Sequence, residues 1–253
     1  MITLKDGRQI PIEQKKKNSL LKILISNIIY GEIEMLDSNW ELINGPDAHH
    51  IEALNAANTI NVIEALITFI IHHQERGCPT REDLCELHRT GTLFLLSAPG
   101  RFREKEVRIE AEGGMIVHKP PPYKSVDGHM DQFFNTLREI WPKSDALEIA
   151  SYALWRINWI HPFVNGNGRT ARAFAYACLC GHLGVILPGK TTIIDQIMET
   201  RLHYQYALRI ADDCVSNGNE PDLTEMKRYL NQLLQIQISS VVDQSNTRPE
   251  IEL

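Results

Sequence analysis

The residues best suited to chemistry lie close together, between positions 161 and 172. His161 comes first, and an imidazole exchanges a proton near neutral pH. Glycines and an asparagine follow, which let backbone N–H groups turn toward one point. Two arginines come next, and their rigid guanidinium groups match phosphate oxygens. The candidate anion-binding residues are Gly166, Asn167, Gly168, Arg169 and Arg172. The pattern predicts an anion-binding loop beside a proton acceptor, although Gly-Asn-Gly is also common in ordinary turns.

Helical patterns flank this loop on both sides. The preceding segment, 146–160, is rich in Ala, Leu, Ile and Trp and is expected to be buried nearly all round. The following helix is expected over 170–183, where alternate alanines allow close packing. Cys178 and Cys180 lie in that apolar run and are expected in the core. Because a helix N-terminus attracts anions, the second helix would add its positive end to the loop.

The stretch from His161 to Arg172 resembles the signature of the Fic family, His-x-Phe-x-Asp/Glu-Gly-Asn-Gly/Lys-Arg-x-x-Arg. Every signature position matches except one, where Asn165 replaces the acid. The resemblance is good over about residues 80–235, and it includes the segments Leu87–Arg89, Pro99–Arg103 and 204–208. Apart from the family, His88 and Arg89 at a helix end are typical of surface residues that favour the helix dipole.

The resemblance implies transfer of a nucleotidyl group, usually AMP from ATP, to a Ser, Thr or Tyr hydroxyl of a target protein. His161 would then be the general base that takes the hydroxyl proton. The backbone N–H groups of residues 166–168 would hold the α- and β-phosphates, with a side-chain bond from Asn167. Arg169 and Arg172 would bind the outer phosphates, so ATP is the expected substrate.

Asn165 puts the role of a metal in doubt. In the family the acid at this position holds the Mg²⁺ that bridges the phosphates, whereas an amide offers only a neutral oxygen. Mg²⁺ is usually held by carboxylates together with phosphates and water, so weak anchoring is expected. Three outcomes stay open: a slow or Mg²⁺-insensitive transferase, a transferase of another phospho-ligand, or a nucleotide- or peptide-binding module without turnover.

A β-hairpin is predicted ahead of the signature. Residues 107–110 alternate as in a strand, Gly113-Gly114 is typical of a turn, and the return strand contains Met115, Ile116, Val117 and His118. The resemblance implies that this hairpin is the flap, to whose edge a target segment adds as an extra strand. A hairpin that only covers the core is the alternative.

A degenerate inhibitory helix is one interpretation of residues 20–35. Many Fic proteins carry the pattern Ser/Thr-x-x-x-Glu-Gly/Asn, whose glutamate pairs with the last signature arginine. Ser26 and Gly31 fit this pattern, but Tyr30 stands where the glutamate would be. An amphipathic core helix explains the segment equally well.

The remaining patterns predict a mainly α-helical protein. Further helices are expected over 47–74, 80–89, 126–140, 191–211 (one or two helices) and 223–238, and a short β-hairpin over 2–12. The predicted architecture is a Fic-like helical bundle with the small flap. We expect an N-terminal hairpin and helical extension over 1–75, the core domain over 76–240 and a polar tail over 241–253.

Composition places the chain among globular proteins of the cytoplasm. Of its 253 residues 43% are apolar and 23% charged, and the net charge of −6 gives no strong signal for nucleic-acid binding. The longest apolar run, 62–71, is too short to span a membrane, and residues 1–6 do not resemble a signal peptide. The five cysteines are odd in number and show no metal-ligand spacing, which favours a reducing compartment. The sequence leaves a homo-oligomer open.

Overall fold

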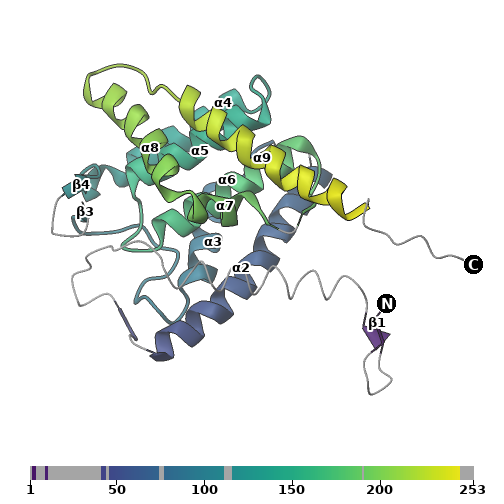
Figure 1. The fold of residues 1–253 in the computed structure, drawn as a ribbon. Helices are drawn as coiled ribbons and strands as arrows, with labels where there is room; N and C mark the ends of the chain where they lie inside the picture. Colours follow the sequence, from purple (N-terminus) through teal and green to yellow (C-terminus); the bar gives the residue numbers. More distant parts are fainter. Residues whose placement is uncertain are drawn as a thin grey trace, which may run out of the picture.

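The computed structural model describes residues 2–3, 9–10, 41–43, 46–73, 77–110, 116–189 and 191–245. The predicted inhibitory segment with Ser26, Tyr30 and Gly31 lies outside these residues, as does Met115 of the predicted flap. The described part is mainly helical, as the sequence predicts, and its helices gather around one core (Figure 1).

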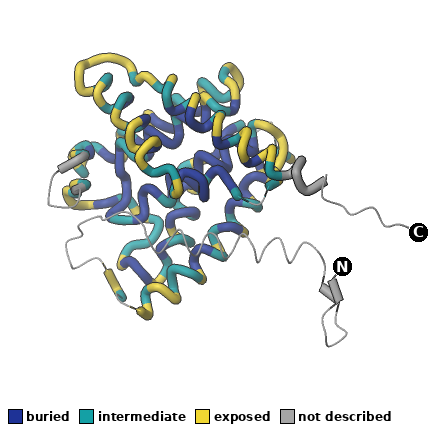
Figure 2. The backbone as a smooth tube through the Cα atoms, in the orientation of Figure 1, coloured by how far each residue is buried: buried dark blue, intermediate teal, exposed yellow. Residues whose placement is uncertain are grey.

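Two helices form the centre of this core, α5 (Ala146–Ile160) and α6 (Asn167–Leu183). They share a more extensive contact than any other pair of elements in the described part. Asp145 caps α5 with a reciprocal capping box that involves Glu148, so its first turn is fixed locally. The alternate alanines of α6 are buried, which lets the neighbouring helices approach, and the tube is dark blue along this helix (Figure 2). Cys178 and Cys180 are buried, as predicted.

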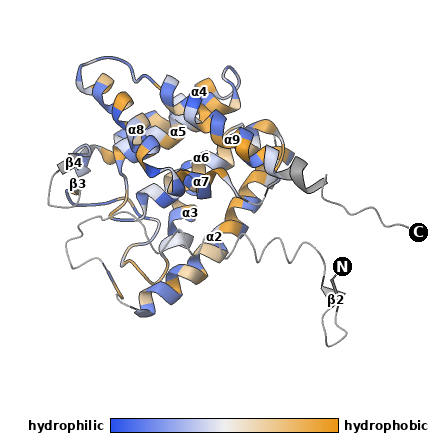
Figure 3. Cartoon of the chain, in the orientation of Figure 1, coloured by the Kyte–Doolittle hydropathy of each residue, from blue (hydrophilic) through white to orange (hydrophobic). Residues whose placement is uncertain are grey.

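Helix α2 (Pro46–His72) packs against α6 and against α3 (Arg81–Thr92). Gly181 makes the α2–α6 contact close, because a Cβ there would lie 2.8 Å from Cγ2 of Ile70. The expectation that no segment is long and apolar enough to cross a membrane is wrong for α2, the one helix that meets both criteria among the described residues. Apolar residues run along α2 (Figure 3), and the buried ones, which are typical of a core helix, are Ala56, Ile60, Ile63, Leu66, Ile67 and Ile70.

The other helices surround this centre. α4 (Val126–Ile140) follows the short 3₁₀ turn η2 (Tyr123–Ser125) and packs on α5. α9 (Thr224–Ser245) crosses α5, α7 (Ile193–Glu199) and α8 (Arg201–Ser216). The apolar face of α4 is buried, as its periodicity predicts, and the predicted segment 191–211 is two helices.

Two short antiparallel strand pairs accompany the helices. Strand β1 (Ile2–Thr3) pairs with β2 (Gln9–Ile10), and β3 (Ile109–Glu110) pairs with β4 (Ile116–His118) with a shift in register. The turns that would join them into hairpins lie outside the described residues. The predicted division near residue 75 stays a prediction. Helix α2, on the N-terminal side of it, packs directly on α3 and α6 of the predicted core domain.

Candidate active site

His161 ends helix α5 in a conformation that is unusual for a residue with a side chain. Its φ of 51° and ψ of 60° are left-handed, and its backbone N–H donates to Ile157 at 2.9 Å. Such strained backbones are often found at functional sites. The residue is 2% exposed, and its Nδ1 atom lies 3.4 Å from the carbonyl oxygen of Asn158. That contact favours a proton on Nδ1, so that the lone pair lies on Nε2, the atom that a general base needs.

The loop after His161 is fixed by the side chain of Asn167. Its Oδ1 accepts from the backbone N–H of Phe163 at 2.8 Å, and its Nδ2 donates to the carbonyl of Phe163 at 2.9 Å. The amide is fully buried. In this conformation Asn167 holds the loop closed, and its contact with a phosphate stays a prediction.

Helix α6 begins at Asn167, three residues earlier than its sequence pattern predicts. The prediction failed because Gly-Asn-Gly is a poor helix former on its own. As a consequence the backbone N–H groups of residues 167–169 belong to the first turn of α6. These groups have no acceptor within the helix, and they share the positive end of its dipole. The candidate phosphate-binding groups therefore sit at a helix N-terminus.

Gly166 is required by both its conformation and its surroundings. Its φ is 78°, and a Cβ there would lie 2.9 Å from Cγ2 of Thr92, a residue of α3. The close approach brings the loop against α3, so Gly166 supplies both backbone freedom and space.

Asn165 and Gly166 bond to each other in this structure. The Gly166 N–H, a predicted phosphate donor, donates to Oδ1 of Asn165, the predicted metal ligand. In the part of the chain that the structure describes, no three His, Cys, Asp or Glu side chains gather as a metal site would require. A single amide oxygen that already accepts a hydrogen bond does not make a protein-held Mg²⁺ site.

The two signature arginines differ in their surroundings. Nη1 of Arg169 lies 3.2 Å from Oε1 of Glu52 on α2, and both side chains are partly exposed. Arg172 is buried. Both border one cavity, which Gly166 also lines and whose other walls come from α2, α3 and α7. A phosphate that reaches Arg169 must therefore compete with the carboxylate of Glu52.

His88 is a buried support of the loop, which corrects the expectation that it is a surface group. It is 1% exposed, and its ring stacks on Phe163 with centroids 3.7 Å apart. The N–H of Gly100 donates to Nδ1 at 2.8 Å, so Nε2 carries the proton and donates to the carbonyl of Asn165 at 2.8 Å. Burial lowers the pKa of His88 to about 3, so the ring is neutral. Arg89 is exposed, as expected, and pairs with Glu86.

His118 anchors strand β4 to the helices. Its Nε2 donates to the carbonyl of Trp159 at 2.9 Å, and its Nδ1 lies 3.7 Å from Oδ2 of Asp212 on α8. Asp212 also accepts a hydrogen bond from Nε1 of Trp155 at 2.9 Å. Burial lowers the pKa of His118 and raises that of Asp212 to about 6. The sequence alone predicts no role for Asp212, because nothing near it in the chain marks it.

These features place a histidine beside a glycine-rich helix N-terminus with two arginines. Residues 78–179 match the family model described as Fic/DOC. The chain has a Fic/DOC domain. The matched range contains His161, the anion-binding loop and the strand pair β3–β4.

Known proteins similar to this chain carry the same family name. It is 25% identical over 232 residues to "Protein adenylyltransferase Fic" of Nematostella vectensis, covering 87% of this chain and 48% of that protein. It is 30% identical over 156 residues to the protein of the same name in Drosophila persimilis, covering 60% and 26% respectively. The chain therefore spans about half, or less, of the length of these relatives.

Solved structures similar to this one are Fic proteins. A Fic family protein from Desulfovibrio desulfuricans G20 has a TM-score of 0.63 at 18% identity, covering 95% of this chain and 69% of that one. A Fic domain containing signaling protein from Bacteroides thetaiotaomicron has a TM-score of 0.64 at 19% identity, covering 92% and 88%. The likeness shows that the fold is that of the Fic proteins.

Proposed function

We propose that this protein transfers a nucleotidyl group, with AMP from ATP as the simplest case, to a Ser, Thr or Tyr hydroxyl of a target protein. The observation that supports the proposal is the short loop that joins His161, at the end of α5, to the first turn of α6. This loop brings a candidate proton acceptor and a candidate phosphate-binding helix end into one segment. The names of the relatives support the same class of reaction.

The reaction follows from these residues. The first N–H groups of α6 would hold the phosphates, and Arg169 and Arg172 would bind the outer ones. The hydroxyl oxygen of the target then attacks the α-phosphorus, the bond between that phosphorus and the bridging oxygen breaks, and pyrophosphate leaves. The hydroxyl proton passes to Nε2 of His161. No residue of this chain needs to hold a metal for the step to balance.

The strand pair β3–β4 would present the target. An extended peptide can add to a strand edge through backbone hydrogen bonds with little demand on its sequence. His118 sits on β4 and is bonded to Trp159, two residues before His161. A strand docked on β4 would therefore be held close to the base.

Binding of a nucleotide or peptide without turnover is the second candidate. It is favoured by the hydrogen bond between Gly166 and Asn165 and by the ion pair between Arg169 and Glu52, both of which must open for a nucleotide. Transfer of a different phospho-ligand is a third reading of the same loop. Both use the same binding site, but the binding module releases no product and the other transferase releases a different one.

His161→Ala separates the transferase from the binding module. If His161 is the general base, the variant loses roughly 10²–10⁴-fold in rate and keeps its affinity for nucleotide. The measurement is labelled-nucleotide incorporation, into the protein itself or a target, beside a nucleotide titration. His182→Ala, in the last turn of the same helix α6, is the control and is expected to keep its activity. Nucleotide binding without incorporation by the unaltered protein would support the binding module.

A further inference from the structure

The side chain of Arg103 lies wholly inside the protein, next to the catalytic loop. Its guanidinium is 0% exposed, whereas its ion-pair partner Glu106, 3.8 Å away, is 62% exposed. Burial lowers the pKa of this guanidinium, although it stays far above neutrality. Because the carboxylate of Glu106 is exposed and does not reach hydrogen-bond distance, the buried guanidinium needs further hydrogen bonds to offset its burial. The hydrogen-bond partners of Arg103 indicate what its side chain holds in place.

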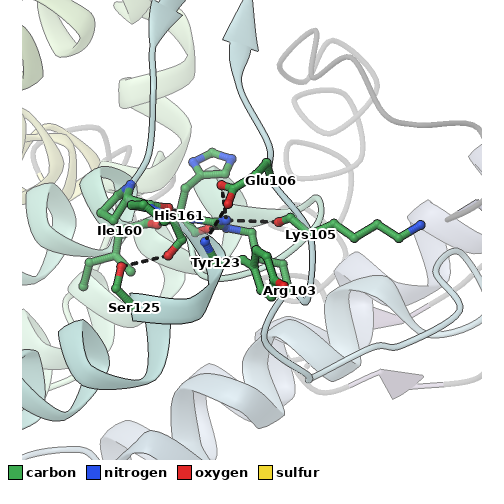
Figure 4. A network of polar contacts seen from close by, with 9 residues as sticks. Arg103, Lys105, Glu106, Tyr123, Ser125, Ile160 and His161 are labelled. Carbon is green, nitrogen blue, oxygen red and sulfur yellow. Dashed lines mark hydrogen bonds and ion pairs between the residues drawn. The ribbon is translucent and has the colours of Figure 1, made fainter.

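Arg103 bonds backbone carbonyls rather than side chains. Nε donates to His161 at 2.8 Å, and Nη2 reaches Ile160 at 3.4 Å. Nη1 donates to Lys105 at 3.1 Å, and Nη2 also donates to Pro121 at 2.5 Å. Figure 4 shows the guanidinium among these groups, with the His161 ring pointing away from it. The backbone N–H of Arg103 donates to Pro162 at 2.8 Å.

Two of these carbonyls belong to the end of α5. The last carbonyls of a helix have no partner within it, and a positive charge there favours the dipole. His161 also has a left-handed backbone, which is costly for a residue with a side chain. Arg103 thus caps α5 from outside the helix and stabilises the conformation that presents the His161 ring.

The other two carbonyls bracket the strand pair. Lys105 precedes β3, and Pro121 follows β4. One guanidinium therefore joins both ends of the segment that carries the strands to the backbone of the catalytic histidine. Lysine could not replace it, because an ammonium on a flexible stem lacks the planar fork of five donors.

We propose that Arg103 is a positioning residue for His161, which fixes the orientation of the base and couples it to the β3–β4 segment. This role rests on the proposed function, in which His161 takes a proton. Arg103 itself touches neither nucleotide nor target. Its removal should therefore act on the chemical step and leave nucleotide affinity nearly unchanged.

The test compares Arg103→Lys and Arg103→Ala with Arg101→Lys, an exposed arginine in the same turn. We expect kcat to fall about 10²-fold in Arg103→Ala, because small misplacements of a reacting group cost that much, and less in Arg103→Lys. KM for ATP should change less than about twofold. Methylguanidinium should restore part of kcat in the alanine variant, and methylammonium should not. Unchanged kcat in both Arg103 variants, or equal rescue by both cations, would overturn the proposal.

A second readout does not depend on transferase activity. In the nucleotide-free protein, the chemical shifts of the His161 ring are measured by NMR at one fixed pH. Arg103→Lys should change these ring shifts, because it removes the fork that fixes the end of α5, whereas Arg101→Lys should not. If the unaltered protein transfers nothing but this difference appears, the proposed function fails and the positioning role stands. If the chemical shifts of the His161 ring are identical in all three proteins, the positioning role is wrong.

Discussion

The loop between α5 and α6 and the strand pair β3–β4 meet near His161, but they are stabilised in different ways. In the loop, buried side chains such as Asn167 and His88 bond to successive backbone groups. The strand pair has two residues on one side and three on the other, and its described links to the helices are few. The difference teaches that the core fixes the reacting geometry, whereas the proposed docking edge depends on backbone groups that many peptides could pair with.

Of the variants proposed, Gly166→Ala should have the largest effect, because it changes the rigid loop between α5 and α6. Gly184→Ala is the matched control, since Gly184 has a similar φ of +73° but a Cβ added there would meet nothing within 4 Å. Strain alone costs about 1–3 kcal/mol of unfolding free energy, and the clash with Thr92 adds to it. Denaturant unfolding and incorporation assays should show a larger loss in Gly166→Ala than in Gly184→Ala. Equal losses would mean that the loop tolerates movement away from α3.

Val117→Pro tests the strand pair β3–β4. A proline in β4 removes a backbone donor, and one or two lost strand bonds should weaken target modification about 5- to 30-fold. Self-modification and stability should change less. Val117→Ala keeps the donor and serves as the control. If the proline variant modifies target and itself in unchanged proportion, strand addition to β4 is not how the target docks.

Part of the contrast between the α5–α6 loop and the strand pair could be predicted from the sequence. The bounds of α4 and α5 follow from local signals, an apolar period and the cap at Asp145, which depend on nearby residues. The types and spacing of the loop residues predict the loop. They do not predict the first turn of α6, because Gly166 and Gly168 disfavour helix locally and packing against α3 decides the outcome.

Contacts between distant segments could not be predicted. The partner of His88 is Asn165, 77 residues along the chain, and the partner of Arg169 is Glu52, 117 residues away. In the sequence Arg103 is marked only by the segment Pro99–Arg103, because its carbonyl partners have no side-chain signature. The signal that could have indicated burial of His88 is its position four residues after Leu84 and next to Leu87, on the apolar face of α3. For the carbonyl partners of Arg103 no sequence signal exists.

Asp212→Asn tests how β4 is anchored through His118. Because folding raises the pKa of Asp212 from 3.8 to about 6, its stabilising contribution is full below pH 3.8 and is lost as the pH rises through 6. His118 has a lowered pKa, so its own contribution is lost as the pH falls. Asparagine keeps an acceptor for Trp155 but does not titrate.

The melting temperature of Asp212→Asn relative to the unaltered protein should therefore rise between about pH 4 and pH 7, by roughly 5–10 °C. Thermal unfolding followed by circular dichroism across this range is the measurement. Glu199→Gln, which removes one exposed negative charge from α7, is the control for the loss of charge alone. A difference in melting temperature that is the same at every pH would show that the charge on Asp212 does not destabilise the folded protein.

Glu52→Gln should have the smallest effect. Releasing Arg169 from a partly exposed ion pair is worth about 0.2–1 kcal/mol, so nucleotide affinity should improve up to about fivefold at low salt. The gain should shrink at high ionic strength. Glu64→Gln on the same helix is the control for general charge. If calorimetric titration finds no gain at low salt, Glu52 does not compete with the phosphates.

The central claim is that His161 directs attack on the α-phosphorus of a nucleotide. Parallel incubations with ATP labelled at the α- or the γ-phosphate test it most directly, with His161→Ala beside the unaltered protein. We expect protein-bound label from α-labelled ATP only, and its loss in His161→Ala. Label from the γ-phosphate, or α-label that survives in His161→Ala, would contradict the claim.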